Sequence, residues 1–131
     1  MSAQATEEKC ILVCDDDKNT IDLLKAILEK EGYSVQSVTT SDKIFFKIDK
    51  CKPGLILMDI WMPEIGGELS THLLKHHKET QDIPILILSG DSEIENIARD
   101  SGADGYIRKP FHAKELIQSV EDHFKSSTEQ Q

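Results

Sequence analysis

The stretch CILVCDDD, residues 10–17, is a short apolar run that ends in three consecutive aspartates. Two further runs, LILM at 55–58 and PILIL at 84–88, are similar in length and composition. Short, continuous apolar runs are typical of strands that are buried on both faces of a parallel sheet. Two weaker candidates, YSVQSV at 33–38 and DGYIR at 104–108, bring the expected number of strands to five.

Segments with helical periodicity alternate with these strands. A capping box from Ser92 to Glu95 is expected to open the fourth of five helices. This alternation predicts an α/β protein with a doubly wound, five-stranded parallel sheet, flanked by five helices and joined by right-handed crossovers. The apolar residues that mark the helices are Ile21, Leu24, Ile27 and Leu28; Ile44, Phe45 and Ile48; Leu69, Leu73 and Leu74; Ile94, Ile97 and Ala98; and Leu116, Ile117, Val120 and Phe124.

Composition limits the domain number and the partners. A chain of 131 residues, 38% of them hydrophobic, fits one domain with its own core. The net charge of −9 argues against a general nucleic-acid or anionic-membrane surface. No CxxC pair is present, and no apolar run reaches the roughly 18 residues of a transmembrane helix. We therefore expect a cytoplasmic protein with reduced thiols, a domain at 10–125, an N-terminal tail at 1–9 and a C-terminal tail or linker start at 126–131.

Polar residues suited to chemistry follow four of the expected strands. Asp15 to Asp17 follow the first strand, Asp59 the third, Ser89 the fourth and Lys109 the fifth. In an open α/β sheet the carboxyl ends of parallel strands meet at one edge, where ligands bind. Two carboxylates ~4 Å apart repel by about 4 kcal/mol at an effective dielectric constant near 20, so a folded site needs a cation or a proton to hold them.

Four motifs in this order, ILVCDDD, LILMDIWMPEIGG, ILILSG and YIRKPF, resemble the receiver domain of two-component response regulators. The resemblance extends from about Cys10 to about Phe124. It implies a flavodoxin-like, CheY-like sheet with strand order 2-1-3-4-5. It also implies a domain that accepts a phosphoryl group from a histidine kinase or phosphotransfer protein and signals to a downstream target or a fused output domain. Such a domain catalyses only its own phosphorylation and dephosphorylation and is not otherwise an enzyme.

The resemblance assigns the acidic residues to one site. Asp59 ends an apolar strand and is a carboxylate nucleophile of the kind that forms an acyl phosphate. Asp15 and Asp16 match the acidic pair that binds Mg²⁺, a hard cation that prefers carboxylates, waters and phosphoryl oxygens. By the same resemblance, Asp16 and Asp59 would ligate directly, Asp15 through water, and Trp61 through its backbone carbonyl. Asp17 is expected to face solvent or to cap the first helix instead.

The resemblance also assigns residues that respond to the phosphoryl group. Lys109 supplies a compact positive charge that can pair with Asp59 and then with a phosphoryl oxygen. Ser89 could donate a hydrogen bond to the phosphoryl group, and Tyr106 matches the aromatic residue whose rotamer reports the state of the domain. The family also implies a cis peptide bond between Lys109 and Pro110.

The chain departs from the family pattern in three places. Gly90 stands where the family often has alanine, and Gly66 stands before Gly67 where an acidic residue is frequent. The segment from Ser89 to Gly102 is about two residues shorter than usual, which affects the start of the fourth helix and the output surface. The histidines of the third helical segment, His72, His76 and His77, are expected to form a solvated face and not a metal site.

Three other classes of protein are alternatives to the receiver domain. A phosphohydrolase of the haloacid dehalogenase type would have a second acid two residues after its nucleophile, where this chain has Trp61. A flavodoxin-like cofactor binder would have a hydroxyl- and glycine-rich loop after the first strand, where this chain has aspartates. A receiver-like adaptor that works by protein binding, without phosphorylation, has the same sequence features and stays open.

Overall fold

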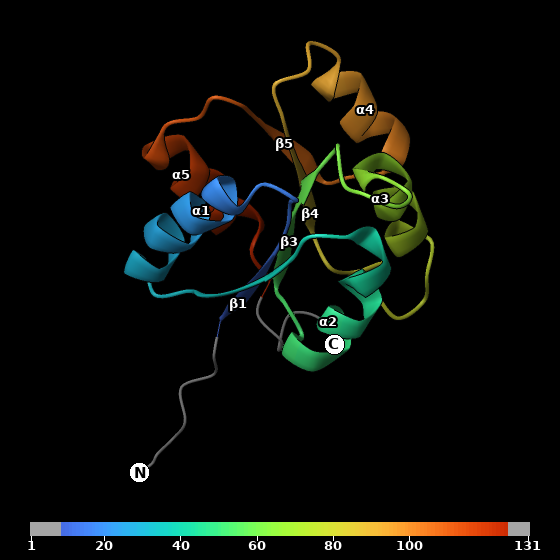
Figure 1. The fold of residues 1–131 in the computed structure, drawn as a ribbon, viewed down its shortest axis with the longest axis horizontal. Coiled ribbons are helices and arrows are strands. Elements are labelled where there is room, and N and C mark those ends of the chain that lie inside the picture. Colours follow the sequence, from blue (N-terminus) through green and yellow to red (C-terminus); the bar gives the residue numbers. More distant parts are fainter. Residues whose placement is uncertain (1–8, 126–131) are drawn as a thin grey trace.

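The computed structural model describes residues 9–125, which form one parallel sheet with helices on both faces (Figure 1). The strands are β1 (Cys10–Cys14), β2 (Ser34–Val38), β3 (Leu55–Asp59), β4 (Ile85–Ser89) and β5 (Gly105–Arg108). The helices are α1 (Lys18–Lys30), α2 (Ile44–Cys51), α3 (Gly67–Lys75), α4 (Ile94–Ser101) and α5 (Ala113–His123), and a 3₁₀ turn, η1 (Ser41–Lys43), precedes α2. The order β2-β1-β3-β4-β5 confirms the predicted fold.

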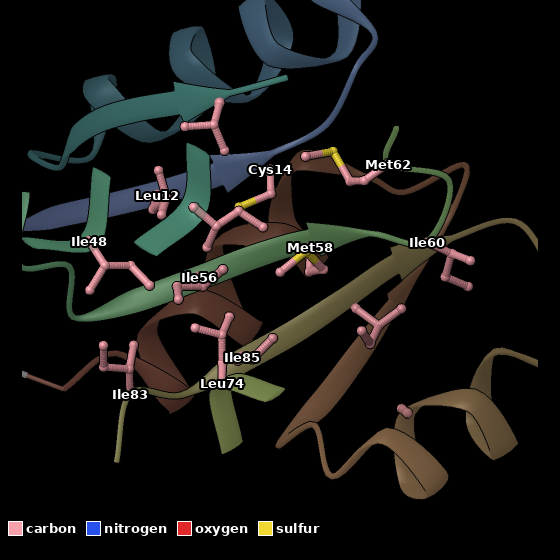
Figure 2. Close-up of a cluster of buried hydrophobic side chains, with 14 of the residues drawn as sticks. Leu12, Cys14, Ile48, Ile56, Met58, Ile60, Met62, Leu74, Ile83 and Ile85 are labelled. Atoms are coloured by element: carbon pink, nitrogen blue, oxygen red, sulfur yellow. The ribbon is translucent and has the colours of Figure 1, made fainter. Parts of the chain in front are cut away.

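The sheet separates two apolar layers. Helices α1 and α5 cover one face, and α2, α3 and α4 cover the other (Figure 1). Neighbouring residues of β1 point to opposite faces, so that Ile11 packs in the α1 and α5 layer and Leu12 in the other. Figure 2 shows the second layer, where Ile48 of α2 and Leu74 of α3 lie over Ile56 of β3. Both layers hold fully buried aliphatic side chains, which is why the central strands read as continuous apolar runs.

Strand register brings the expected site residues together. The pairing of β1 with β3 places Asp15 level with Asp59. The pairing of β3 with β4 places Ser89 one residue beyond that level, and the pairing of β4 with β5 places Lys109 two residues beyond it. All four residues therefore lie at the carboxyl edge of the sheet, as the sequence predicted.

The start of α4 differs from the prediction. The expected capping box from Ser92 to Glu95 is wrong, because α4 begins at Ile94 and Glu93 occupies the cap position without a side-chain hydrogen bond. A turn made by Asp91 occupies this segment instead. Its Oδ1 accepts from the Glu93 N–H at 2.8 Å, and its carbonyl accepts from the Ile94 N–H at 3.1 Å. Because the turn uses these amides, the helix starts late and has only 8 residues.

The last helix is slightly shorter than the sequence predicts. Helix α5 ends at His123, one residue before Phe124, which is half-buried with its ring centroid 5.3 Å from that of Tyr33. The tails expected at 1–9 and 126–131 lie outside the described residues, apart from Lys9. None of the helices within residues 9–125 has the length and apolar character needed to cross a membrane.

Two glycines connect β3 to α3 in different ways. Gly66, at the cap position of α3, has a φ of 84°, a conformation that glycine adopts at little cost. Gly67 has ordinary dihedrals, but its N–H donates to the Ile60 carbonyl at 2.8 Å, and a Cβ built on it would overlap the Asp59 carbonyl oxygen. The first helical turn therefore lies directly against the residue that ends β3.

We expect Gly67→Ala to lower the free energy of unfolding by about 1–3 kcal/mol, because the new methyl group must push the helix away from β3. Urea unfolding followed by circular dichroism measures this change. Gly90→Ala is the matched control, since its Cβ would lie 3.4 Å from the Lys109 carbonyl oxygen, and it should change the free energy by less than about 0.5 kcal/mol. Equal stability of Gly67→Ala and the wild type would contradict the close approach.

Candidate functional site

A lysine bridges two buried carboxylates at the carboxyl edge of the sheet. Lys109 Nζ lies 3.2 Å from Asp59 Oδ1 and 3.3 Å from Asp15 Oδ2. Asp15 is 1% exposed and Asp59 is 5% exposed. Backbone amides hold the other carboxylate oxygens: the Asp17 N–H donates to Asp15 Oδ1 at 2.9 Å, and the Trp61 N–H donates to Asp59 Oδ2 at 3.2 Å. These bonds orient both carboxylates toward the same point.

A third carboxylate completes an acidic cluster. Ligand oxygens of Asp15, Asp16 and Asp59 all lie within 4.8 Å of one another, and Asp16 is exposed to solvent. Three carboxylates with an open, solvated side form an all-oxygen donor set, which is the type that Mg²⁺ binds while it keeps several waters. The residues present therefore fit a hard divalent cation.

Burial and charge set the protonation of the pair at the centre. Burial raises the pKa of Asp59, Lys109 opposes this rise, Asp15 adds to it, and the net shift is upward. Burial lowers the pKa of the Lys109 ammonium, but Asp59 and Asp15 outweigh that effect, so its pKa lies above the ordinary value. Lys109 is therefore charged at neutral pH and compensates the two carboxylates that it contacts.

Ser89 lies beside the acidic cluster and is bonded within its own loop. The side chain is 2% exposed, and its Oγ accepts from the Asp91 N–H at 3.0 Å. The Ser89 carbonyl accepts from the Lys109 N–H at 2.8 Å, which connects the ends of β4 and β5. Tyr106 on β5 is 37% exposed, and the Arg108 guanidinium lies 5.9 Å from the centre of its ring. The tyrosine therefore contributes to the outer surface of β5 and does not enter the core.

Three smaller expectations are confirmed. The Asp17 side chain accepts from the Asn19 N–H at 2.9 Å and caps α1. The peptide bond between Lys109 and Pro110 is cis. The histidines are exposed, with His72 on α3 and the other two, His76 and His77, at its carboxyl end.

Sequence reasoning missed one residue that shapes the site. Ser41 is buried although it begins the 3₁₀ turn, and its Oγ donates to the Pro63 carbonyl at 2.9 Å and accepts from the Ile65 N–H at 3.0 Å. It thereby ties the loop after Asp59 to the segment before α2. In the sequence, Thr40-Ser41-Asp42 shows only the composition of an ordinary helix start, which carries no sign of a contact more than 20 residues away.

Comparison with known proteins identifies the family. The model of the response regulator receiver domain matches residues 11–121. The chain is 35% identical over 112 residues to the DNA-binding dual master transcriptional regulator RpaA of Synechocystis, covering 84% of this chain and 46% of RpaA. It is 33% identical over 112 residues to the phosphate regulon transcriptional regulatory protein PhoB of Klebsiella pneumoniae, covering 84% of this chain and 49% of PhoB.

Solved structures of other proteins have the same fold as this chain. The receiver domain of NtrX from Brucella abortus superposes with a TM-score of 0.80 at 31% identity, covering 89% of this chain and 99% of that one. Chemotaxis protein CheY4 of Vibrio cholerae shares the fold, with a TM-score of 0.82 at 22% identity over 90% of this chain and all of CheY4. The chain therefore belongs to the response regulator receiver domain family. Such domains act in two-component signalling and are not conventional enzymes. The chain spans about half the length of RpaA and PhoB.

Proposed function

We propose that this receiver domain is a phosphorylation-dependent switch that accepts a phosphoryl group on Asp59 in a Mg²⁺-dependent reaction. One observation carries the proposal: Lys109 Nζ lies 3.2 Å from Asp59 Oδ1 at the end of a buried strand, with two further carboxylates within 4.8 Å. A solvated loop aspartate would have neither the lysine nor the acidic neighbours. The arrangement suits a nucleophile whose product carries additional negative charge.

The chemistry follows from these residues. One carboxylate oxygen of Asp59 attacks the phosphorus of a phosphohistidine, the N–P bond breaks, and the histidine leaves with its electron pair, so that an acyl phosphate forms on Asp59. Lys109 then pairs with a phosphoryl oxygen. Asp15, Asp16, Asp59 and the Trp61 carbonyl would hold Mg²⁺, which would supply positive charge that neutralises the phosphoryl oxygens. Hydrolysis of the acyl phosphate returns Asp59 to its free carboxylate.

The signal would pass through Ser89. A phosphoryl group on Asp59 offers acceptor oxygens that the Ser89 hydroxyl can bond only in the modified state. The Ser89 Oγ would then leave the Asp91 N–H, which it accepts from at 3.0 Å, and the loop would shift. Gly90 offers little steric resistance to such a shift. Space behind the loop would let Tyr106 turn inward. This rotation would change the surface formed by α4, β5 and α5, so that a target would bind the two states with different free energies.

The partners in this proposal are a sensor histidine kinase or phosphotransfer protein and a downstream target or fused output domain. We place the protein in the cytoplasm, without direct contact of this domain with nucleic acid or membrane. The net charge of −9 supports the lack of contact with nucleic acid or membrane, since a phosphate backbone or an anionic lipid surface would repel the domain.

The deciding experiment is intact-mass measurement after incubation with a small phosphodonor such as acetyl phosphate, with and without Mg²⁺. We expect one added phosphoryl group per chain with Mg²⁺ and little without it. Peptide mapping should place the modification on Asp59. A chain that stays unmodified in Mg²⁺ would favour the receiver-like adaptor, which binds its partner without phosphorylation.

The acidic cluster gives a further prediction, on metal binding. Asp16→Asn should weaken Mg²⁺ binding at least tenfold, or about 1.4 kcal/mol, because one of its carboxylate ligands loses its charge. Without metal, the same variant should melt at a higher temperature than the wild type, since repulsion among the three carboxylates is reduced. Calorimetric titration and thermal melting measure the two effects.

The matched control for the metal site is Asp17→Asn. Asn caps helices as well as Asp does, and the Asp17 side chain bonds to Asn19 and Thr20 at the start of α1, so both Mg²⁺ affinity and stability should stay near wild type. Wild-type Mg²⁺ affinity in Asp16→Asn would remove Asp16 from the proposed ligands.

A further inference from the structure

Large apolar side chains are exposed in a regular series beside the site. Trp61, Ile65, Leu69 and Leu73 are 70%, 47%, 46% and 44% exposed, and they follow one another at intervals of four residues. The first two lie in the loop after β3, and the last two lie one turn apart on α3. Exposed apolar groups that gather in this way mark interaction surfaces more often than scattered ones do.

Two hollows border Trp61, Ile65 and Leu69 of this series and form a groove. The first has a volume of about 470 Å³ and lies between the loop after β3 and the start of α4, where Trp61 and Ile97 line it. The second has a volume of about 450 Å³ and lies between α3 and α4, lined by Leu69 among others. Ile65 and Glu68 line both hollows, so the two lie next to each other. Figure 1 shows α3 and α4 as neighbours on one face of the sheet.

The polar rim of this groove is acidic. Glu64, Glu68, Asp91 and Asp100 line the hollows, and among the described residues no lysine or arginine does so. Within residues 9–125, Glu64 and Glu68 form no ion pair. An apolar floor with an acidic rim complements a helix that has one apolar face and flanking cationic residues.

We propose that the groove between the β3–α3 loop, α3 and α4 is a docking site for a cationic amphipathic helix of another protein. The acidic rim would attract the cationic residues, and Trp61, Ile65 and Leu69 would receive the apolar face. The charge of the chain favours a different protein over a second copy, because two molecules with a net charge of −9 repel each other. Docking needs no phosphoryl group, so this proposal stands independently of the proposed function.

The position of the groove places a docked helix next to Asp59. Trp61 forms one end of the groove, and its N–H donates to Asp59 Oδ2 at 3.2 Å. Asp91 lines the same hollow, and its N–H donates to Ser89 Oγ at 3.0 Å. The two loops that hold the candidate site therefore also form the wall of the groove.

The chain contains its own reporter for a binding experiment. Trp61 is the only tryptophan in the sequence and lies in the groove, so its fluorescence reports binding without a label. The probe is a synthetic leucine–lysine peptide of about four helical turns, patterned as an amphipathic helix. We expect a saturable blue shift of Trp61 emission that weakens as salt is added. A leucine–glutamate peptide with the same pattern and a lysine–serine peptide with the same charge should produce no shift.

Paired variants separate the groove from the rest of the acidic surface. Glu68→Lys should weaken peptide binding about tenfold or more, whereas Glu29→Lys, an equal charge change on exposed α1, should weaken it less than about twofold. Leu69→Ser should weaken it about fivefold or more, and Leu23→Ser, at a residue of similar exposure on α1, should leave it unchanged. All four residues are exposed, so the variants should fold, and melting curves check this.

Three results would overturn the docking site. Equal binding of the leucine–glutamate peptide would show that charge plays no part. Equal affinities of the groove variants and their α1 controls would place the peptide elsewhere. A blue shift that depends on protein concentration alone, with a dimer in sedimentation, would make the occupant a second copy of this chain and not a cationic helix.

Discussion

Asp59→Asn is expected to abolish phosphoryl incorporation and, in metal-free buffer, to raise the melting temperature of the domain. The first effect follows because the amide that replaces the carboxylate is no nucleophile for the phosphoryl group. The second follows because burial raises the pKa of Asp59 above its ordinary value of 3.8, so its charged form costs folding free energy at neutral pH. Loss of modification together with increased stability would distinguish a missing nucleophile from a damaged fold.

The pH dependence of this stability difference has a defined sign. A carboxyl group with a raised pKa in the folded state costs nothing below its unfolded pKa, where it is protonated in both states. The cost appears as the pH rises through the folded pKa. The wild type and Asp59→Asn should therefore have similar stability below about pH 3.8, and the variant should gain as the pH rises to neutral.

Intact mass and urea unfolding with a chelator present measure both effects. Asp82→Asn, an exposed aspartate in the turn before β4, is the control and should accept the phosphoryl group as the wild type does. Modification that persists in Asp59→Asn would identify a different acceptor. A pH-independent difference in stability would show that the charge of Asp59 is compensated more fully than its burial indicates.

The fold was predictable because two features of the sequence agree. Continuous apolar runs such as 55–58 predicted central strands, and the polar residue after each run predicted the edge where the site lies. The exact register was not needed, since parallel strands with short loops bring their carboxyl ends to the same level. Asp15, Asp59 and Lys109 could therefore be grouped from the sequence, and their hydrogen bonds confirm the grouping.

Other features depend on contacts that no local pattern records. The predicted capping box at Ser92 failed because Asp91 makes a turn with the Glu93 and Ile94 amides, and α4 begins only at Ile94. Ser41 binds a loop more than 20 residues away, and only the folded chain brings the two together. Helical periodicity located α3 correctly, but it could not show that Leu69 and Leu73 face solvent while Leu74 is fully buried. Periodicity identifies an apolar stripe, and packing decides how much of it is covered.

Lys109→Met is expected to be the most destabilising change at the site. Methionine keeps much of the apolar stem but removes the positive charge, so Asp15 and Asp59 remain buried and facing each other without a cation. Removing one partner of a buried ion pair typically costs 3–5 kcal/mol, and the 28% exposure of the Lys109 side chain places the expected loss near about 3 kcal/mol. Urea unfolding in metal-free buffer at pH 7 measures it.

An exposed ion pair on α1 provides the matched control. Lys18 Nζ lies 3.3 Å from Asp22 Oδ1, and the two side chains are 84% and 58% exposed. Lys18→Met removes this ion pair and should lower the free energy of unfolding by no more than about 0.5 kcal/mol. A similar loss in the two variants would mean that the buried carboxylates do not depend on Lys109.

Acid and Mg²⁺ should each repair the Lys109→Met variant, because each removes the same repulsion. The pKa of Asp59 in the folded variant should rise further without the lysine, so stability is lost as the pH rises through that pKa and regained as the pH falls toward the unfolded value. Mg²⁺ replaces the missing positive charge among the same oxygens and should stabilise the variant more than the wild type. A deficit that neither acid nor Mg²⁺ reduces would assign the loss to packing of the Lys109 stem and not to its charge.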